Sequence, residues 1–176
     1  MTQATATTLA AFVAATASLV ALAVAMIRDR RTELRASRRE GLRPHVDELA
    51  TATWECVAVA VVIAAKANSD QKVTEWITRG RSASESLKRL RLPIRYTVPG
   101  LEGPIRTLSL IPDWAAHVRK DAARSTELSA RATDLRKAID ACIIRVTIAG
   151  LPPRKRDVRR ALKASAAALA VFGDGR

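Results

Sequence analysis

The sequence holds few side chains of the kinds that perform catalysis or bind metals. Its two histidines, His45 and His117, lie far apart in the chain, as do its two cysteines, Cys56 and Cys142. A zinc site needs Cys and His ligands at short, characteristic spacings, and the CxxC, HExxH and HxxxH spacings are all absent. We therefore expect two buried thiols, two ordinary histidines, no metal centre and no cofactor.

Motifs that bind phosphates or build a nucleophile are also missing. The sequence contains no GxGxxG, no Walker A lysine motif and no GxSxG. The acidic pair Asp47 and Glu48 falls at a predicted helix start, where negative charge stabilises the helix dipole and needs no catalytic explanation. We predict that the protein is not an enzyme.

Basic side chains are the one group of residues in the sequence whose charge suggests a binding function. The 176 residues include 30 Lys and Arg against 17 Asp and Glu, a net charge of +13. We define a neck cluster of Arg28, Arg30, Arg31, Arg35, Arg38 and Arg39 and a C-terminal cluster of Arg154, Lys155, Arg156, Arg159, Arg160 and Lys163. Both are predicted to bind an anionic membrane surface.

The C-terminal cluster leaves other readings open: a solvated face, a nucleic-acid site or a site for an acidic protein. Nucleic acid ranks low because no helix-turn-helix signature is present and aromatic residues make up only 3% of the chain.

An apolar segment precedes the neck cluster and sets the predicted location. Residues 1–27 carry no charged side chain, and residues 9–27 are apolar apart from Thr16 and Ser18. A helix of this length reaches about 28 Å, close to the hydrocarbon thickness of a bilayer. We predict a single transmembrane helix at 9–27, with residues 1–8 outside the cell.

The alternatives to a permanent anchor are a cleaved signal peptide and a buried helix of a soluble protein. A signal peptide requires a basic start, which residues 1–8 lack. A buried helix of a soluble protein is seldom apolar on all sides for five turns. Arginines directly after the apolar run fix that side as cytoplasmic, so we expect residues 28–176 inside the cell at the inner membrane.

A second apolar stretch, at 49–65, is nearly long enough to span the bilayer. Glu55 lies near its middle, where a carboxylate is costly, and a second crossing would export a basic stretch. We predict that 44–67 is instead the central helix of a cytoplasmic domain, and we keep a two-span protein with Glu55 in the membrane as an alternative.

The rest of the chain reads as helices separated by breakers. We predict helices over 70–90, 113–149 and 153–172, and an irregular loop over 92–112 because four prolines fall within it. That stretch holds Tyr96, the only tyrosine, and several apolar residues, so we expect it to pack on the bundle. A heptad pattern in the third of these helices is explained by packing inside one bundle, or by a coiled coil between chains.

The last helix is predicted to turn one apolar stripe to the core, formed by Val158, Leu162, Ala166, Leu169 and Phe172.

Together these features predict an all-α protein. It would consist of a membrane span, a basic neck over 28–43 and an antiparallel bundle of about four helices over 44–176. The predicted partners are the membrane and its anionic headgroups, and a second copy or another protein through the bundle. Small residues spaced four apart in the span would suit a dimer. The predicted role is interaction or scaffolding at the membrane, and the alternative is a soluble, basic, nucleic-acid-binding helical protein. A high share of Arg over Lys, together with many Ala, is typical of bacteria with GC-rich genomes.

Overall fold

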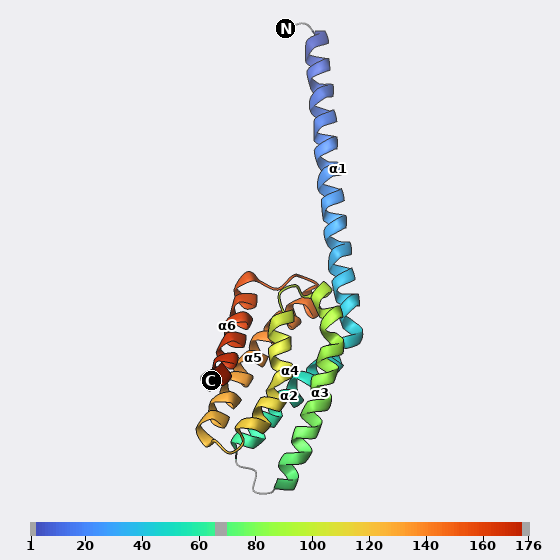
Figure 1. The fold of residues 1–176 in the computed structure, drawn as a ribbon. Helices are drawn as coiled ribbons and strands as arrows, with labels where there is room; N and C mark the ends of the chain where they lie inside the picture. The colour runs from blue at the N-terminus through green and yellow to red at the C-terminus, as the bar shows by residue number, and fades with distance from the viewer. Residues whose placement is uncertain (1–2, 66–69, 174–176) are drawn as a thin grey trace. The chain divides into compact units, whose positions relative to one another are not determined.

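A computed structural model describes the backbone of residues 3–65 and 70–173 and the side chains of residues 16, 18–65 and 73–171. The described elements are all helices (Figure 1). They are α1 (Gln3–Leu42), a short 3₁₀ turn (Arg43–His45), α2 (Val46–Ala64), α3 (Asp70–Thr97), α4 (Glu102–Val118), α5 (Ala122–Ala149) and α6 (Lys155–Gly173). The all-α prediction is confirmed.

The chain divides into two compact units, residues 1–37 and residues 38–176. The first unit consists of the greater part of α1 alone. Its described apolar side chains, including Leu19, Val20 and Met26, are all exposed because a single helix offers them nothing to pack against.

Within the described residues, no helix is both long enough and apolar enough to cross a membrane. The predicted external tail, 1–8, and the side chains of residues 9–15 and 17 of the predicted span lie outside the described part. The transmembrane helix therefore stays a prediction.

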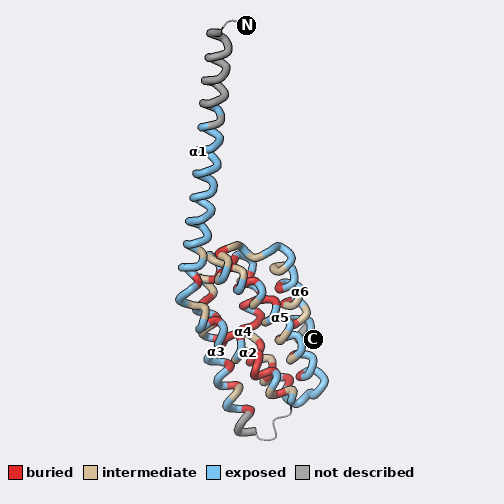
Figure 2. Tube along the Cα trace, turned by 180° about the vertical axis from the view of Figure 1, so that it is seen from behind, coloured by how far each residue is buried: buried red, intermediate tan, exposed pale blue. Residues whose placement is uncertain are grey.

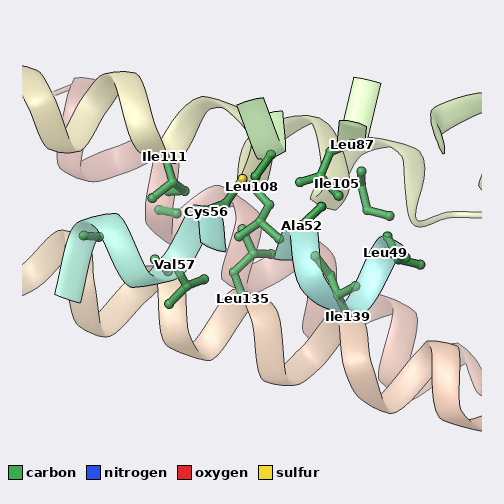
Figure 3. Close-up of a cluster of buried hydrophobic side chains, with 14 of the residues drawn as sticks. Leu49, Ala52, Cys56, Val57, Leu87, Ile105, Leu108, Ile111, Leu135 and Ile139 are labelled. Atoms are coloured by element: carbon green, nitrogen blue, oxygen red, sulfur yellow. The ribbon is translucent and has the colours of Figure 1, made fainter. Parts of the chain in front are cut away.

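The second unit is an antiparallel bundle of α2 to α6, one helix more than predicted. The predicted central helix packs against three neighbours, since α2 contacts α3, α4 and α5, but α4 is the helix that contacts all four others, including α6. Figure 3 shows side chains from α2, α3, α4 and α5 meeting in one core, among them Leu49, Cys56, Leu108 and Leu135. Buried positions line the interior and exposed ones the outside (Figure 2).

The second-span alternative is not supported for the segment at 49–65. It lies within α2, whose side chains Leu49, Cys56 and Val59 are almost completely buried in the bundle core. Glu55 sits at the surface of this helix and pairs with Arg79 of α3 at 3.1 Å. Its charge is thus accommodated without a membrane environment.

The predicted irregular loop at 92–112 is wrong. α3 continues through Pro93 to Thr97, and α4 begins at Glu102, so the connection is only residues 98–101. Pro104 falls in the first turn of α4, where a missing backbone N–H costs little. The chain reverses at Gly100, whose φ of 91° suits glycine. The prediction was wrong because it took every proline of this segment as a helix breaker, whereas Pro93, Pro104 and Pro112 all lie within helices.

The predicted helix over 113–149 is two helices. Asp121 adopts an extended conformation and caps α5, its carboxylate accepting hydrogen bonds from the backbone N–H groups of Ala123 and Arg124. The heptad pattern itself is confirmed as the inner face of α5, since Leu128, Leu135 and Cys142 are fully buried.

The predicted apolar stripe on α6 is wrong at Leu162, Ala166 and Leu169, which are exposed, whereas Val158 packs against the core as expected. The side chain of Phe172 lies outside the described residues. The buried residues of α6 are mainly small: Ala161, Ser165 and Ala168 face the bundle, while Leu162 and Leu169 are 47% and 45% exposed. Small side chains let α6 approach closely, and the Ser165 hydroxyl pairs with Thr107 of α4 at 2.7 Å. The hydrogen bond between Ser165 and Thr107 and the close packing of small side chains therefore stabilise this orientation of α6 more than burial of Leu162 and Leu169 would.

Candidate anionic membrane-surface site

One end of the bundle is where the chain enters it, at Arg38, and we call it the entry end. It is formed by the start of the second unit, the α3–α4 turn and the α5–α6 connection (Figure 1). Several contacts join these segments. Arg39 donates to the carbonyl of Ala149 at 3.5 Å, and Thr97 packs against Gly41.

The α3–α4 turn also packs on the first turn of α6. A β carbon at Gly100 would lie 2.8 Å from Val158 Cγ1, so the backbone of the turn touches this side chain. Arg145 of α5 donates to the carbonyl of Pro152 at 2.9 Å and folds the α5–α6 connection back over the helix end. α5 itself ends at Gly150, where φ is 61°. These contacts hold the three segments of the entry end against one another.

The structure brings part of the two predicted clusters together here. Arg38 and Arg39 start the second unit, and Arg154, Lys155 and Arg156 start α6 at the same end. The other members of the C-terminal cluster, Arg159, Arg160 and Lys163, are exposed farther along α6. Arg156 pairs with Asp157 at 3.5 Å, which offsets one of these charges.

The remaining neck arginines lie in the first unit. Arg28, Arg31 and Arg35 share one side of α1 with Val24 and Ile27, while Arg30 lies elsewhere on the helix. All four arginines are exposed. These cations directly follow the apolar run of α1, where they are suited to contact anionic headgroups.

Sequence reasoning missed a second group of cations at the entry end. Arg91 and Arg95, on the last turns of α3, both reach Glu102 at the start of α4, at 2.6 and 3.8 Å. The hydrogen bond from Arg91 lowers the pKa of Glu102; desolvation opposes it, and the charges of Arg95, Arg91 and Arg106 lower the pKa further. Two cations share one carboxylate, so the local charge stays positive.

Exposed apolar side chains accompany these cations. Tyr96 is 78% exposed and Leu92 is 63% exposed, although the stretch that contains them packs on the bundle as expected, with Ile94, Val98 and Ile105 fully buried. On α5, Ile148 and Ile144 are also exposed. In the sequence, Leu92 and Tyr96 are spaced four residues apart, as are Ile144 and Ile148. This spacing places each pair on one helix face, but it points to a shared surface only when α3 and α5 are known to end at the same end of the bundle.

A second surface feature lies between α2 and α3. The Trp54 and Trp76 rings are 6.1 Å apart between centroids, and the Arg79 guanidinium lies 4.8 Å above the Trp76 ring. Arg79 is also the partner of Glu55. The arrangement ties α2 to α3 and accounts for the Glu55 charge.

The histidines and cysteines are not brought together as a site. Cys56 and Cys142 are buried, and their thiols are unpaired with each other. Burial raises the pKa of Cys56 to about 12, with a contribution from the Glu55 charge, and that of Cys142 to about 11, with a contribution from Asp157. In the described part of the chain, no three His, Cys, Asp or Glu residues lie close enough to hold a metal ion.

Comparisons with known proteins add no relative from which a role could be transferred. No protein-family profile, no curated protein and no solved structure matches this chain.

Proposed function

We propose that this chain is a single-pass inner-membrane protein whose cytoplasmic helical bundle serves as an interaction or scaffolding module without catalysis. Residues 9–27 would form the anchor, residues 1–8 would lie outside, and the basic clusters would face anionic headgroups.

The observation that carries this proposal is the exposure of apolar side chains all around one stretch of α1. Leu19, Val20, Leu22, Val24, Met26 and Ile27 are between 53% and 66% exposed, with no other element in their unit to cover them. Such a helix is unfavourable in water and favourable in lipid. Arg28 follows at once, as expected for the cytoplasmic edge of a span.

The scaffolding role is supported by what the bundle offers. Its core is fully formed by its own helices, and its described surface carries ion pairs such as Arg81–Asp113 and Arg91–Glu102. The sequence lacks nucleophile, phosphate-loop and metal motifs. A rigid helical body held at a membrane is suited to binding partners.

Carbonate extraction of the full chain tests the anchor. The unaltered protein should stay in the membrane pellet, because an inserted helix resists both high salt and alkaline carbonate. A Val20→Arg/Val24→Arg variant should move to the supernatant, since each arginine at mid-span costs about 2.5–3.5 kcal/mol on the insertion scale.

Leu34→Arg is the control, because Leu34 is also exposed on α1, at 50% against 63% for Val20 and 59% for Val24, but lies beyond the apolar run. It should stay in the pellet. Extraction of the unaltered chain, or equal behaviour of the two arginine variants, would overturn the anchor.

A soluble nucleic-acid-binding protein remains the second candidate, favoured by the exposed C-terminal cluster and the net charge of +13. Its signature is salt dependence: binding to duplex DNA or RNA should weaken steeply between roughly 50 and 200 mM salt. Charge-neutralising substitutions at Arg159 and Arg160 should flatten that dependence if this candidate holds.

A further inference from the structure

Three arginines gather around a single carboxylate where α3 turns into α4 (Figure 1). Arg91 Nη2 donates to Glu102 Oε1 at 2.6 Å, and Arg95 Nε lies 3.8 Å from Glu102 Oε2. Arg106 follows Glu102 by four residues on α4, which places both on one helix face, and its charge acts on the same carboxylate. Three positive charges and one negative charge leave a local net charge of +2.

The hydrogen-bond donors of this group also exceed its acceptors. A guanidinium carries several N–H donors, whereas a carboxylate offers only its two oxygens. The distance from Arg95 Nε to Glu102 is longer than a hydrogen bond, and Arg91 Nε is buried without a hydrogen-bond partner among the described residues. Arg95 and Arg106 are exposed, so an acceptor from outside the chain can reach them.

The first turn of α6 brings further positive charge to the same place. Val158 touches the backbone of the α3–α4 turn at Gly100. The α6 turn that holds Val158 has two cations, Lys155 and Arg156, and one acidic residue, Asp157, which pairs with Arg156 at 3.5 Å. The potential around the α3–α4 turn is therefore positive, which attracts anions.

Phosphate fits both the charge and the donors of this group. A phosphate group carries close to two negative charges and several strong acceptor oxygens, and arginine forms paired hydrogen bonds with such oxygens. A carboxylate ligand would bring only one charge. Space is also open beside the turn, because a β carbon at Gly103 would meet nothing within 4 Å.

We propose that Arg95 and Arg106, held beside the Arg91–Glu102 ion pair at the α3–α4 turn, bind the phosphate group of a small ligand. Arg91 neutralises Glu102, so Arg95 and Arg106 keep their charge for the ligand. The ligand is free phosphate or a phosphate monoester. This site goes beyond the proposed function and does not depend on the anchor, because all its residues lie within the unit of residues 38–176.

The test is a titration of the full chain in micelles of a non-ionic maltoside, which contains no phosphate. The probes are inorganic phosphate and glycerol 3-phosphate, added at about pH 7.5, where phosphate esters are dianions, and at an ionic strength held constant with chloride. The amide NMR signals of Gly103 and Arg106 should shift and saturate. Tighter binding of glycerol 3-phosphate assigns the site to esters, and equal or weaker binding assigns it to free phosphate. No saturable shift with either probe would overturn the proposal.

Two variants remove the proposed ligand contacts. Arg95→Gln and Arg106→Gln should each weaken binding about tenfold or more, because each loses a hydrogen bond to a charged group. Arg81→Gln is the matched control: Arg81 lies on the same helix as Arg95, is 62% exposed against 64%, and is also ion-paired, with Asp113. It should leave the Kd unchanged. An equal loss in all three variants would show only a general attraction by charge and would contradict the site.

Glu102→Gln separates a ligand site from a purely structural ion pair. Loss of the carboxylate raises the local net charge from +2 to +3 and releases Arg91, so phosphate should bind several-fold tighter. Arginines that serve only to hold α3 against α4 would give no such gain. Urea unfolding in chloride alone shows whether each variant is folded. Weaker binding to folded Glu102→Gln than to the unaltered chain would overturn the proposal.

Discussion

Thr107 of α4 and Ser165 of α6 form a hydrogen bond of 2.7 Å between hydroxyl groups that are almost fully buried. The bond joins the last helix to the bundle on the face where small side chains allow close packing. It also explains why Ser165 faces inward while Leu162 and Leu169 face outward.

Thr107→Val should lower the free energy of unfolding by about 1–3 kcal/mol, because it leaves the buried Ser165 hydroxyl without a partner. Ser165→Ala should cost a similar amount. The double variant should cost clearly less than the sum of the two, since it removes both polar groups. Urea unfolding followed by circular dichroism measures the cycle, and strict additivity would show that the bond contributes nothing.

The corrected orientation of α6 gives a second prediction. Leu162→Ser and Leu169→Ser should each change stability by no more than about 0.5 kcal/mol, because both side chains are largely exposed. Ala168→Leu should cost about 1–3 kcal/mol, because Ala168 is fully buried and the larger side chain has no room. Thermal melts of the three variants decide it, and the opposite ranking would restore the predicted leucine stripe.

At Gly80, α3 lies close to both α2 and α4. A β carbon there would overlap Val59 Cγ2 of α2 and lie 3.0 Å from Pro112 Cβ of α4. Gly80→Ala should therefore destabilise the bundle by about 1–3 kcal/mol, although alanine favours a helix over glycine.

Gly103→Ala is the matched control, because nothing lies within 4 Å of the added methyl group. It should be neutral or slightly stabilising. Chemical unfolding of the two variants side by side is the measurement, and a stabilised Gly80→Ala variant would show that the helices are packed less closely.

The buried thiols make stability and reactivity depend on pH. Their pKa values are raised in the folded chain from an ordinary 9.0 to about 12 for Cys56 and about 11 for Cys142. A raised folded pKa contributes stability that is fully present below pH 9 and is lost as the pH rises toward 11 and 12.

At pH 8, a thiol reagent such as dithionitrobenzoate should react with the folded protein far more slowly than with the urea-unfolded protein. Cys142→Ala should reduce the loss of stability between pH 9 and pH 11. Two rapidly reacting thiols in the folded chain would contradict their placement in the core.

In α2 and α5, the spacing of apolar residues in the sequence predicted correctly which helix faces are buried. The apolar half of α2 predicted a core helix, although α4 rather than α2 contacts all the other helices of the bundle. The heptad positions Leu128, Leu135 and Cys142 predicted the inner face of α5. In both cases the hydrophobic effect determines which side chains are buried, and the apolar residues that it buries can be identified from the sequence.

Breakers and polar contacts were harder to interpret. Pro93 and Pro112 lie inside helices, which only the surrounding packing can permit, whereas Asp121 ends one helix and caps the next. The burial of Ser165 depends on Thr107, 58 residues earlier in the chain. The composition of the entry end could not be predicted from the sequence either. The ends of α3 and α5, with Tyr96 and Ile148, come together there only through the folding of the bundle.

The most direct test of the account is the membrane topology of the full chain in bacterial cells. A reporter that fluoresces only in the cytoplasm is fused after Arg176, and the fluorescence is followed through carbonate-washed membranes. The account predicts a bright fusion that stays with the membrane. A bright fusion released into the supernatant would contradict it, and so would a membrane-bound fusion that stays dark.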